Sequence, residues 1–460
     1  MHPSALVGLL AFAAAASAVP TEPRQAHSSS SIDNLKSNVK NVVVLVMENR
    51  SVDNLLGGQT IHGLDNPINN GPFCNPYNVT DPSQGYHCTT AKDYDSVTDD
   101  PSHAVTGNTM EFFGQWTPDN AMIADGKLVP NNNGFIHEQI HNHGATANET
   151  VKAMLAKQVM NYYTEEQTPV MTSLVQNFLT FNHWHSDVAG PTDPNRFAVV
   201  AGTSAGHGSN DHTFGTYAFT QRSIFQQLGE TNHTWLNYWD IAGGTGPEAH
   251  WFAWTKATNN TNKVVPMTQF HADAANGVLP EFSYLNPSCC GVGTTSMHDS
   301  GLISDGEAFI KQVYESLRAS PQWEETLFVL TFDESGGFHD HVPPPLAIRP
   351  DNLTYTEKAP NGEEYTLEFN RLGGRIPTLL ISPWVSKGYV EQKGTSHHGQ
   401  TVSYSATSIL RTLGYLWDFE PFNPRVESAA SFDHLIRNSP RKDAPINLPT
   451  PQKFSSKMRK

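Results

Sequence analysis

Three nearly continuous apolar runs indicate buried strands in this chain. They cover Val42–Met47, Thr326–Phe332 and Ile376–Ile381, and runs of this length are typical of strands buried on both faces of a parallel sheet. Apolar residues at helical spacing predict helices over 149–163, 306–318 and 405–416. Because predicted strands alternate with predicted helices, the chain is expected to adopt a layered α/β fold.

Residues 57–148 interrupt this pattern. They are rich in Asn, Gly, Pro and Asp, and the segment is too long for a simple connection. We expect an insertion or cap with a role in function. No repeat or linker divides the rest, which predicts a single domain over 39–440. A polar, flexible leader over 19–38 and a C-terminal tail over 441–460 are expected to flank it.

The N-terminus has the features of a secretory signal peptide. An apolar run over Leu6–Ala16 precedes the small residues Ala16-Ser17-Ala18, which predicts a signal peptide over residues 1–18. The mature protein is therefore expected to be secreted, either free or held in the cell wall or periplasmic space. Five Asn-x-Ser/Thr sites are then expected to carry glycans: Asn78, Asn148, Asn232, Asn259 and Asn352.

Four cysteines in an oxidising compartment predict two disulfides. Cys74 and Cys88 lie in one Pro/Gly/Asn-rich loop, so their pairing needs the least rearrangement. That pairing leaves Cys289 and Cys290 as a bridge between neighbours, whereas crosswise bridges are the alternative. The sequence leaves the connectivity open.

Composition narrows the functional class. The 29 Lys and Arg against 45 Asp and Glu give a net charge of −16, which argues against nucleic acid as a partner because such binding needs clustered basic residues. The hydrophobic content of 38% is enough for a large core. No obligate protein partner is indicated. The 21 histidines favour metal or phosphate chemistry.

Polar residues follow each buried run directly. Glu48 and Asn49 follow the first run, Asp333 and Glu334 the second, and Ser382–Trp384 the third. Ligands bind at the carboxyl ends of strands in parallel sheets, so the three acids and the amide are expected to meet at one edge. Clustered carboxylates require a compensating cation. The three acids and the amide therefore predict a site for one divalent metal ion. The alternative is that each acid caps the following helix or faces solvent. Oxygen ligands favour Ca²⁺, Mg²⁺ or Mn²⁺, and nearby histidines keep Zn²⁺ open.

A third group of polar residues lies between a strand predicted over Phe178–Phe181 and an apolar helical segment. Asp193 is the expected N-cap and Pro194 the first helical residue. Thr192 would then lie at a helix N-terminus, which favours anions. A hydroxyl there, beside a metal, can ionise and attack phosphorus.

Asn195 and Arg196 follow on the same segment and are expected to bind phosphoryl oxygens, Arg196 through its planar fork. The alternative is an ordinary helix start in which Thr192 is only a turn residue. His185, shortly before this segment, is a candidate for lining the pocket.

Four blocks of the chain resemble motifs of the phosphoesterase family that contains bacterial and plant phospholipases C and some acid phosphatases. Glu48–Asp53 is similar to its ENRSFD-type motif and Gly190–Arg196 to its GPTxPNR motif. Asp333–Pro344 resembles DExxGxxDHVxPP, and Arg375–Pro383 resembles RVPxxxxSP. The blocks occur in the family order. The resemblance implies an alkaline-phosphatase-like three-layer α/β/α sandwich with a metal-assisted phosphoesterase site.

The resemblance also implies roles for individual residues. Four match the metal ligands: Glu48, Asn49, Asp333 and Glu334. Thr192 matches the nucleophile, and His103 matches a histidine that contacts phosphate in a DPxH motif. His298 falls where the family has a histidine, although Ser-Met-His-Asp-Ser departs from the family's Glu-His-Pro. Asp340 and His341 match the DHV element and are expected to act on phosphate or to support the ligands.

These features predict a secreted phospholipase C that cleaves the glycerol–phosphate ester of phospholipids through Thr192, with transient contact to a membrane surface. His298 or His341 would protonate the leaving oxygen. The alternative is a secreted acid phosphatase acting on phosphomonoesters. A silent glycoprotein that keeps the fold only for binding is a third reading. The roles of His397 and His398 stay open.

Overall fold

The computed structural model describes residues 27–92, 99–240 and 246–453. The predicted signal peptide over 1–18 therefore lies outside the described residues. Within them, none of the helices combines the length and the apolar character that crossing a bilayer requires.

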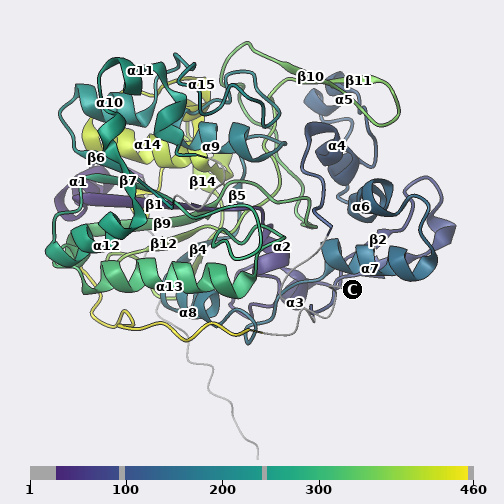
Figure 1. Cartoon of the computed structure of the whole chain (residues 1–460), viewed down its shortest axis with the longest axis horizontal. Helices are drawn as coiled ribbons and strands as arrows, with labels where there is room; N and C mark the ends of the chain where they lie inside the picture. The colour runs from purple at the N-terminus through teal and green to yellow at the C-terminus, as the bar shows by residue number, and fades with distance from the viewer. Residues whose placement is uncertain (1–26, 93–98, 241–245, 454–460) are drawn as a thin grey trace, which may run out of the picture.

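One eight-stranded sheet organises the molecule (Figure 1). β1 (Asn41–Met47) lies at its centre, parallel to β9 (Thr326–Phe332) on one side and to β8 (Phe282–Asn286) on the other. Every residue of β1 and β9 is buried, which confirms the strands predicted from these two apolar runs. The outer strands are β6 (Trp235–Trp239) and β7 (Val264–Pro266) beyond β8, and β12 (Leu379–Ile381), β4 (Leu179–Phe181) and β13 (Tyr389–Glu391) beyond β9.

The third predicted strand forms as β12, but it runs antiparallel to both of its neighbours, β9 and β4. Its carboxyl end therefore lies at the opposite edge, where the Ser382 hydroxyl donates to the carbonyl of Thr326 at the start of β9, 2.8 Å away. Ser382–Trp384 therefore lies apart from the acidic residues that follow β1 and β9, and the apolar run alone could not show this because it does not encode strand direction. Arg375, just before β12, pairs with Asp53 and Asp340.

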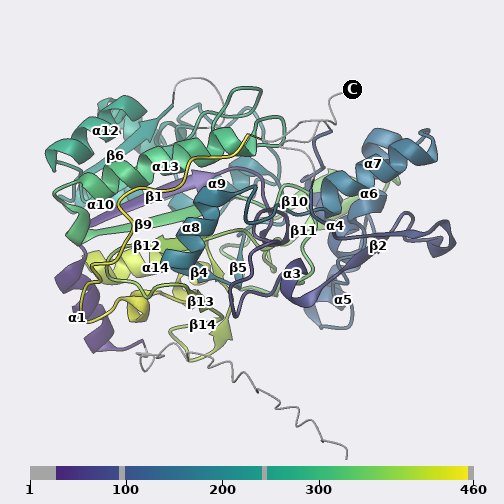
Figure 2. The same cartoon turned by 90° about the horizontal axis from the view of Figure 1, so that it is seen from below.

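Helices cover both faces of the sheet (Figures 1 and 2). One layer contains α8 (Pro169–Asn177), α12 (Met267–Asn276) and α13 (Ile303–Ala319). The other contains α9 (Thr192–Ala201), α10 (Ile224–Glu230), α11 (Ala253–Ala257), α14 (Ala406–Trp417) and α15 (Pro424–Ser428). The predicted helices correspond to α13, α14 and α7 (Glu149–Met160). The α/β class and its three-layer arrangement are confirmed.

The segment over 57–148 forms most of a lobe beside the sheet, at the right in Figure 1. It contains α3 (Pro67–Asn70), α4 (Val105–Phe113), α5 (Asn120–Ala124), α6 (Phe135–Gly144) and the hairpin of β2 (Cys74–Pro76) and β3 (Tyr86–Cys88). A buried cluster of its own, including Phe112, Phe135 and Val159, joins α4 and α6 to α7. The lobe thus extends past residue 148 through α7. The Cys74–Cys88 disulfide closes the hairpin.

Smaller elements complete the fold. They are α2 (Val52–Leu55), the pair β5 (Trp184–His185) and β16 (Tyr404–Ser405), and the hairpins β10 (Tyr355–Lys358)–β11 (Glu364–Leu367) and β14 (Gly394–Thr395)–β15 (Thr401–Val402).

The predicted flexible leader is wrong for its second half, which forms α1 (Ser29–Asn38). Ser28 and Ser31 form a capping box, so these serines begin a helix rather than a linker. The Ser31 hydroxyl also donates to Asp433, 2.5 Å away, and Leu35 is fully buried. The predicted tail likewise packs on the domain, because Tyr314 and Lys311 of α13 donate to backbone carbonyls at Pro445 and Leu448.

We expect Leu35→Ala to lower the free energy of unfolding by about 2–4 kcal/mol, because it opens a cavity under α1. Asp33→Ala, on the exposed face of the same helix, should change it by less than about 0.5 kcal/mol. Urea unfolding of both variants measures the difference. Equal stability of the two variants would mean that α1 does not contribute to the core.

Candidate active site

The carboxyl ends of β1 and β9 bring four polar residues together. Met47 pairs with Phe332, so Glu48 and Asp333 leave the sheet side by side. Asp333 Oδ1 accepts from the backbone amides of Asn49 (3.0 Å) and Glu334 (2.8 Å). Glu48, Asn49, Asp333 and Glu334 are all buried. The structure thus joins the four residues predicted as metal ligands, across 284 residues of sequence in the case of Asn49 and Asp333.

Thr192 lies at the same edge, at the start of α9. Its Oγ1 donates to Glu48 Oε1 at 2.8 Å, and its side chain is buried. The predicted cap was wrong by two positions, since Pro191 is the N-cap and Thr192 the first helical residue. Asp193 instead donates its backbone amide to Asn210 Oδ1. The helix start therefore aims the threonine hydroxyl at the acidic cluster.

Arg196 does not face a substrate, contrary to the prediction. Its guanidinium is buried and donates to Asp333 Oδ2 (2.9 Å), Glu48 Oε2 (2.7 Å) and Glu248 Oε1 (3.3 Å), and also to two carbonyls of β1. Arg196 lies one helical turn after Thr192, which directs it beneath the cluster rather than outward. Its role is to compensate the buried carboxylates.

Asn195 is also occupied by the protein itself. Its Nδ2 donates to the carbonyls of Val188, Gly190 and Pro191, and its Oδ1 accepts from the amide of Val188. With its polar atoms engaged in this way, Asn195 shapes the loop that presents Thr192 and is not positioned to bind phosphate.

Burial and mutual repulsion control the charges of the cluster. Burial acts to raise the pKa of Glu48, but Arg196 and further contacts from Asp333, His298 and Thr192 hold that pKa below its ordinary value. Burial and the neighbouring Glu48 carboxylate raise the pKa of Asp333 well above its usual range. Burial likewise raises the pKa of Glu334. One guanidinium is therefore not enough positive charge for three carboxylates.

Unpaired buried atoms at this edge of the sheet are suited to a divalent cation. In the described part of the chain, both polar atoms of the Asn49 side chain and Oε1 of Glu334 are buried without a hydrogen-bond partner. Buried polar atoms are normally paired, and amide and carboxylate oxygens are ligands for hard divalent ions. Gly336 leaves room beside them, because a Cβ there would lie 2.6 Å from Asn49 Oδ1.

His298 enters the site from the loop that follows β8, the strand next to β1. Its Nδ1 lies 2.5 Å from Asp299 Oδ1, and its Nε2 lies 3.8 Å from Asp100 Oδ2. Burial opposes protonation, but the bond to Asp299 and the charges of Glu48 and Asp100 raise the pKa of His298 to about 9. The imidazole therefore carries a proton at neutral pH. Asp299 and Asp100 were missed from sequence, although the departure from Glu-His-Pro at position 299 was visible.

His103 borders a cavity of about 320 Å³ that Asp100 and Pro191 also line. Its Nδ1 lies 3.0 Å from the carbonyl of Pro101. Since Pro191 immediately precedes Thr192, the cavity reaches the start of α9. The lobe formed by the insertion thus contributes Asp100 and His103 to the surroundings of the site.

Asp340 and His341 belong to a separate ion-pair network rather than to the substrate site. Asp340 accepts from Arg375 Nε (2.8 Å), and Arg375 also binds Asp53 (3.0 Å). The two nitrogens of His341 face Asp53 (2.8 Å) and Asp65 (2.9 Å). The turn after Glu334 carries these side chains toward Asp53 of α2, so they bind other protein groups instead of facing Thr192. Of the two expected roles, this arrangement favours support of the site over direct action on phosphate.

Three further histidines named from the sequence, His185, His397 and His398, are placed as follows. His185 is buried with Nδ1 2.9 Å from the carbonyl of Gly373, and burial lowers the pKa of His185 to about 3, so it supports the chain as a neutral side chain. His397 and His398 are exposed in the turn between β14 and β15.

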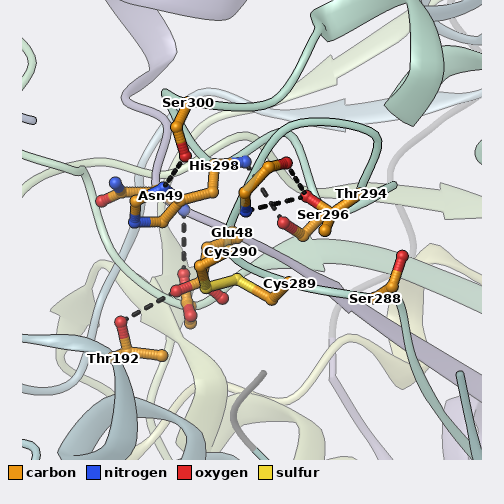
Figure 3. Close-up of a disulfide and its surroundings, with 12 residues drawn as sticks. Glu48, Asn49, Thr192, Ser288, Cys289, Cys290, Thr294, Ser296, His298 and Ser300 are labelled. Carbon is orange, nitrogen blue, oxygen red and sulfur yellow. Dashed lines mark hydrogen bonds between the residues drawn. A yellow bond between two sulfur atoms is a disulfide. The ribbon is translucent and has the colours of Figure 1, made fainter. Parts of the chain in front are cut away.

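Both disulfides are now assigned. Cys74 pairs with Cys88, and Cys289 pairs with Cys290, so the crosswise alternative is excluded. The second disulfide lies in the same loop as His298 and faces Glu48, as Figure 3 shows. This proximity was not predicted.

Comparisons with known proteins agree with these motifs. The Phosphoesterase family matches residues 39–420. The non-specific phospholipase C3 of Arabidopsis thaliana is 32% identical over 429 residues, which cover 90% of this chain and 76% of the plant protein. The non-hemolytic phospholipase C of Burkholderia pseudomallei is 24% identical and the match covers 78% of this chain and 53% of that protein. A solved structure in the alkaline phosphatase superfamily, from Vibrio parahaemolyticus, has 12% identity and a TM-score of 0.31, covering 60% of this chain and 64% of that chain.

We expect Arg196→Met to lower the free energy of unfolding by about 3–5 kcal/mol, because it leaves buried carboxylates unpaired. Arg222→Met is a matched control, since Arg222 is exposed and donates to the side chains of Gln227 and Glu230 at the surface, where such a pair should contribute at most about 1 kcal/mol. Urea unfolding of both variants without added metal makes the comparison. Native stability of Arg196→Met would contradict the compensating role.

Proposed function

This chain belongs to the phosphoesterase family and is a phosphoric ester hydrolase, and we propose that it acts as a phospholipase C that releases diacylglycerol and a phosphorylated head group. The single observation that carries the proposal is the 2.8 Å hydrogen bond from Thr192 to Glu48 at the acidic sheet edge. It joins a nucleophile to a set of oxygen ligands. The names of the plant and bacterial relatives support the phospholipid as substrate.

Thr192 is the proposed nucleophile. The ionised Glu48 carboxylate holds the hydroxyl proton, so that a lone pair of Oγ1 is directed at phosphorus. A divalent cation held by Glu48, Asn49, Asp333 and Glu334 would favour the ionised hydroxyl and offset the charge of the phosphoryl group. Attack forms a phospho-threonine and expels the glycerol oxygen, and water then hydrolyses the phospho-threonine.

His298 is the proposed acid for the leaving group. It is protonated at neutral pH because Asp299 and Asp100 stabilise the imidazolium. A proton on the leaving oxygen avoids the release of an alkoxide, which is the usual gain from general acid catalysis. His103 lines the adjacent cavity and is the proposed contact to the phosphoryl oxygens.

The alternative is a phosphomonoesterase with the same residues. Turnover of phosphatidylcholine vesicles and of p-nitrophenyl phosphate by the purified protein separates the two. We expect diacylglycerol and phosphocholine from vesicles at a kcat/KM well above that for p-nitrophenyl phosphate. The opposite preference would establish the acid phosphatase.

We expect Thr192→Ala to reduce kcat by about 10³-fold or more, because the covalent route is lost. Thr192→Ser keeps a hydroxyl on the same turn and should retain measurable turnover. Phospholipid hydrolysis and circular dichroism of both variants test this. Near-native turnover by a folded Thr192→Ala protein would rule out the covalent step.

We expect Asp299→Asn to move the alkaline limb of the kcat–pH profile to lower pH. Native activity should fall as pH rises through about 9, where His298 loses its proton. Removing the Asp299 charge lowers the pKa of His298, so the acid is lost at a lower pH. An unchanged profile would show that another group donates the proton.

Secretion is part of the proposal. The signal-peptide pattern supports it, and Asn148, Asn232, Asn259 and Asn352 are exposed while Asn78 is partly exposed. These positions are accessible to a glycosylating enzyme. Contact with a lipid surface would be transient and would serve substrate access.

A further inference from the structure

The Cys289–Cys290 disulfide touches the catalytic cluster without a role in the proposed reaction. One carboxylate oxygen of Glu48 and the two sulfurs lie within 4.8 Å of one another. Cys289 is buried, whereas Cys290 is exposed and open to a reductant in solution. Figure 3 shows the sulfurs beside Glu48, whose carboxylate also accepts the hydrogen bond from Thr192.

The loop that carries the disulfide is fixed at its base. The backbone amide of Thr295 donates to the Ser288 carbonyl at 3.1 Å, and the two side-chain hydroxyls lie 3.0 Å apart. The next residue, Ser296, accepts from the backbone amide of Glu48 at 3.0 Å. These bonds hold residues 289 and 290 over Glu48 independently of the disulfide.

The tip of the loop has room to adjust. A Cβ built on Gly291 or Gly293 would meet no atom within 4 Å among the described residues, and Val292 is 74% exposed. Two sulfurs must move from about 2 Å apart in a disulfide to roughly 3.5–4 Å to bind one ion with Zn–S distances of about 2.3 Å. Because the tip of the loop is open to solvent while its base is held by hydrogen bonds, the two sulfurs can move apart by this amount.

We propose that reduction of Cys289–Cys290 creates a second cation site, formed by the two sulfurs and Glu48, that takes a thiophilic divalent ion such as Zn²⁺ or Cd²⁺. A dithiol reductant supplies two electrons and two protons, the S–S bond breaks, and the reductant becomes a cyclic disulfide. The ion then displaces the two thiol protons and binds both sulfurs and one Glu48 oxygen. In the oxidised protein the sulfurs bind each other, and the oxygen ligands alone favour hard ions.

Capture of such an ion withdraws Glu48 from Thr192. Reduction in the presence of Zn²⁺ should therefore inhibit turnover, and reoxidation should restore it. This consequence rests on the proposed function, whereas cation binding by the reduced loop does not. Binding and turnover are therefore measured separately.

The test is a Cd²⁺ titration of oxidised protein and of protein reduced with dithiothreitol and freed of it by gel filtration without oxygen. The readout is the ultraviolet charge-transfer band of thiolate-bound Cd²⁺. We expect one site per chain, with the band and at least 100-fold tighter binding, only after reduction. Peptide mapping after alkylation confirms which cysteines were reduced, and circular dichroism confirms the fold.

Two double variants identify the sulfurs. Cys74→Ser/Cys88→Ser removes the distant disulfide and should keep the band, whereas Cys289→Ser/Cys290→Ser should lose it. Glu48→Gln should keep the band but bind Cd²⁺ at least tenfold more weakly. A reduced, folded native protein without the band overturns the proposal, as does a band that persists in Cys289→Ser/Cys290→Ser.

A turnover assay completes the experiment. Zn²⁺ should inhibit reduced native protein at least tenfold more strongly than oxidised protein, and it should inhibit Cys289→Ser/Cys290→Ser equally under both conditions. Cd²⁺ binding without phospholipid turnover in any state would retain the cation site and reject the proposed function. Equal inhibition of oxidised and reduced native protein would reject the link between the site and catalysis.

Discussion

The site depends on a single buried guanidinium surrounded by carboxylates. Arg196 binds Glu48, Asp333 and Glu248 at once, and its charge favours the ionised form of each of these buried acids. Because Arg196 belongs to the same helix as Thr192, the ion pair between Arg196 and Glu48 also helps to fix the distance from the Thr192 hydroxyl to Glu48. Helix α9 therefore both compensates the acids, through Arg196, and positions the Thr192 hydroxyl.

The positive charge of Arg196 does not fully compensate the buried carboxylates, which points to a further ligand at the site. Glu334 and Asn49 keep unpaired buried atoms, which is costly in a folded protein unless a ligand satisfies them. A second network at Asp340 shows the contrast, because Arg375 pairs with Asp53 and Asp340 directly. Both networks contain buried acids and one arginine, but only the first leaves oxygens free and has a hydroxyl beside it. The difference separates the candidate metal site from a structural ion-pair network.

The loop after β8 contains both the histidine proposed as the acid and a disulfide. It carries His298 and its partner Asp299, and it also carries the Cys289–Cys290 disulfide. His298 and the disulfide lie near Glu48 because β8 runs parallel to β1 and ends at the same edge. A change in the sulfur chemistry of this loop would therefore act directly on the residue that holds the Thr192 proton.

Local sequence determined the central strands, the main helices and the identity of the acidic cluster. Continuous apolar runs specify buried strands, and an acid directly after such a run must emerge at the strand end. Strand direction, and with it the place of Ser382 and Arg375, depended on the pairing of β12 with β9, which no local pattern encodes. Ser283 and Asn286 interrupt the apolar pattern of β8, so the loop with His298 and the cysteines could not be located. The partners of Arg196 and Asn195 were likewise decided by tertiary structure, because a side chain that is able to donate to phosphate donates to a buried carboxylate or carbonyl instead when packing brings one closer. Asp340 in turn accepts from Arg375, which packing places beside it.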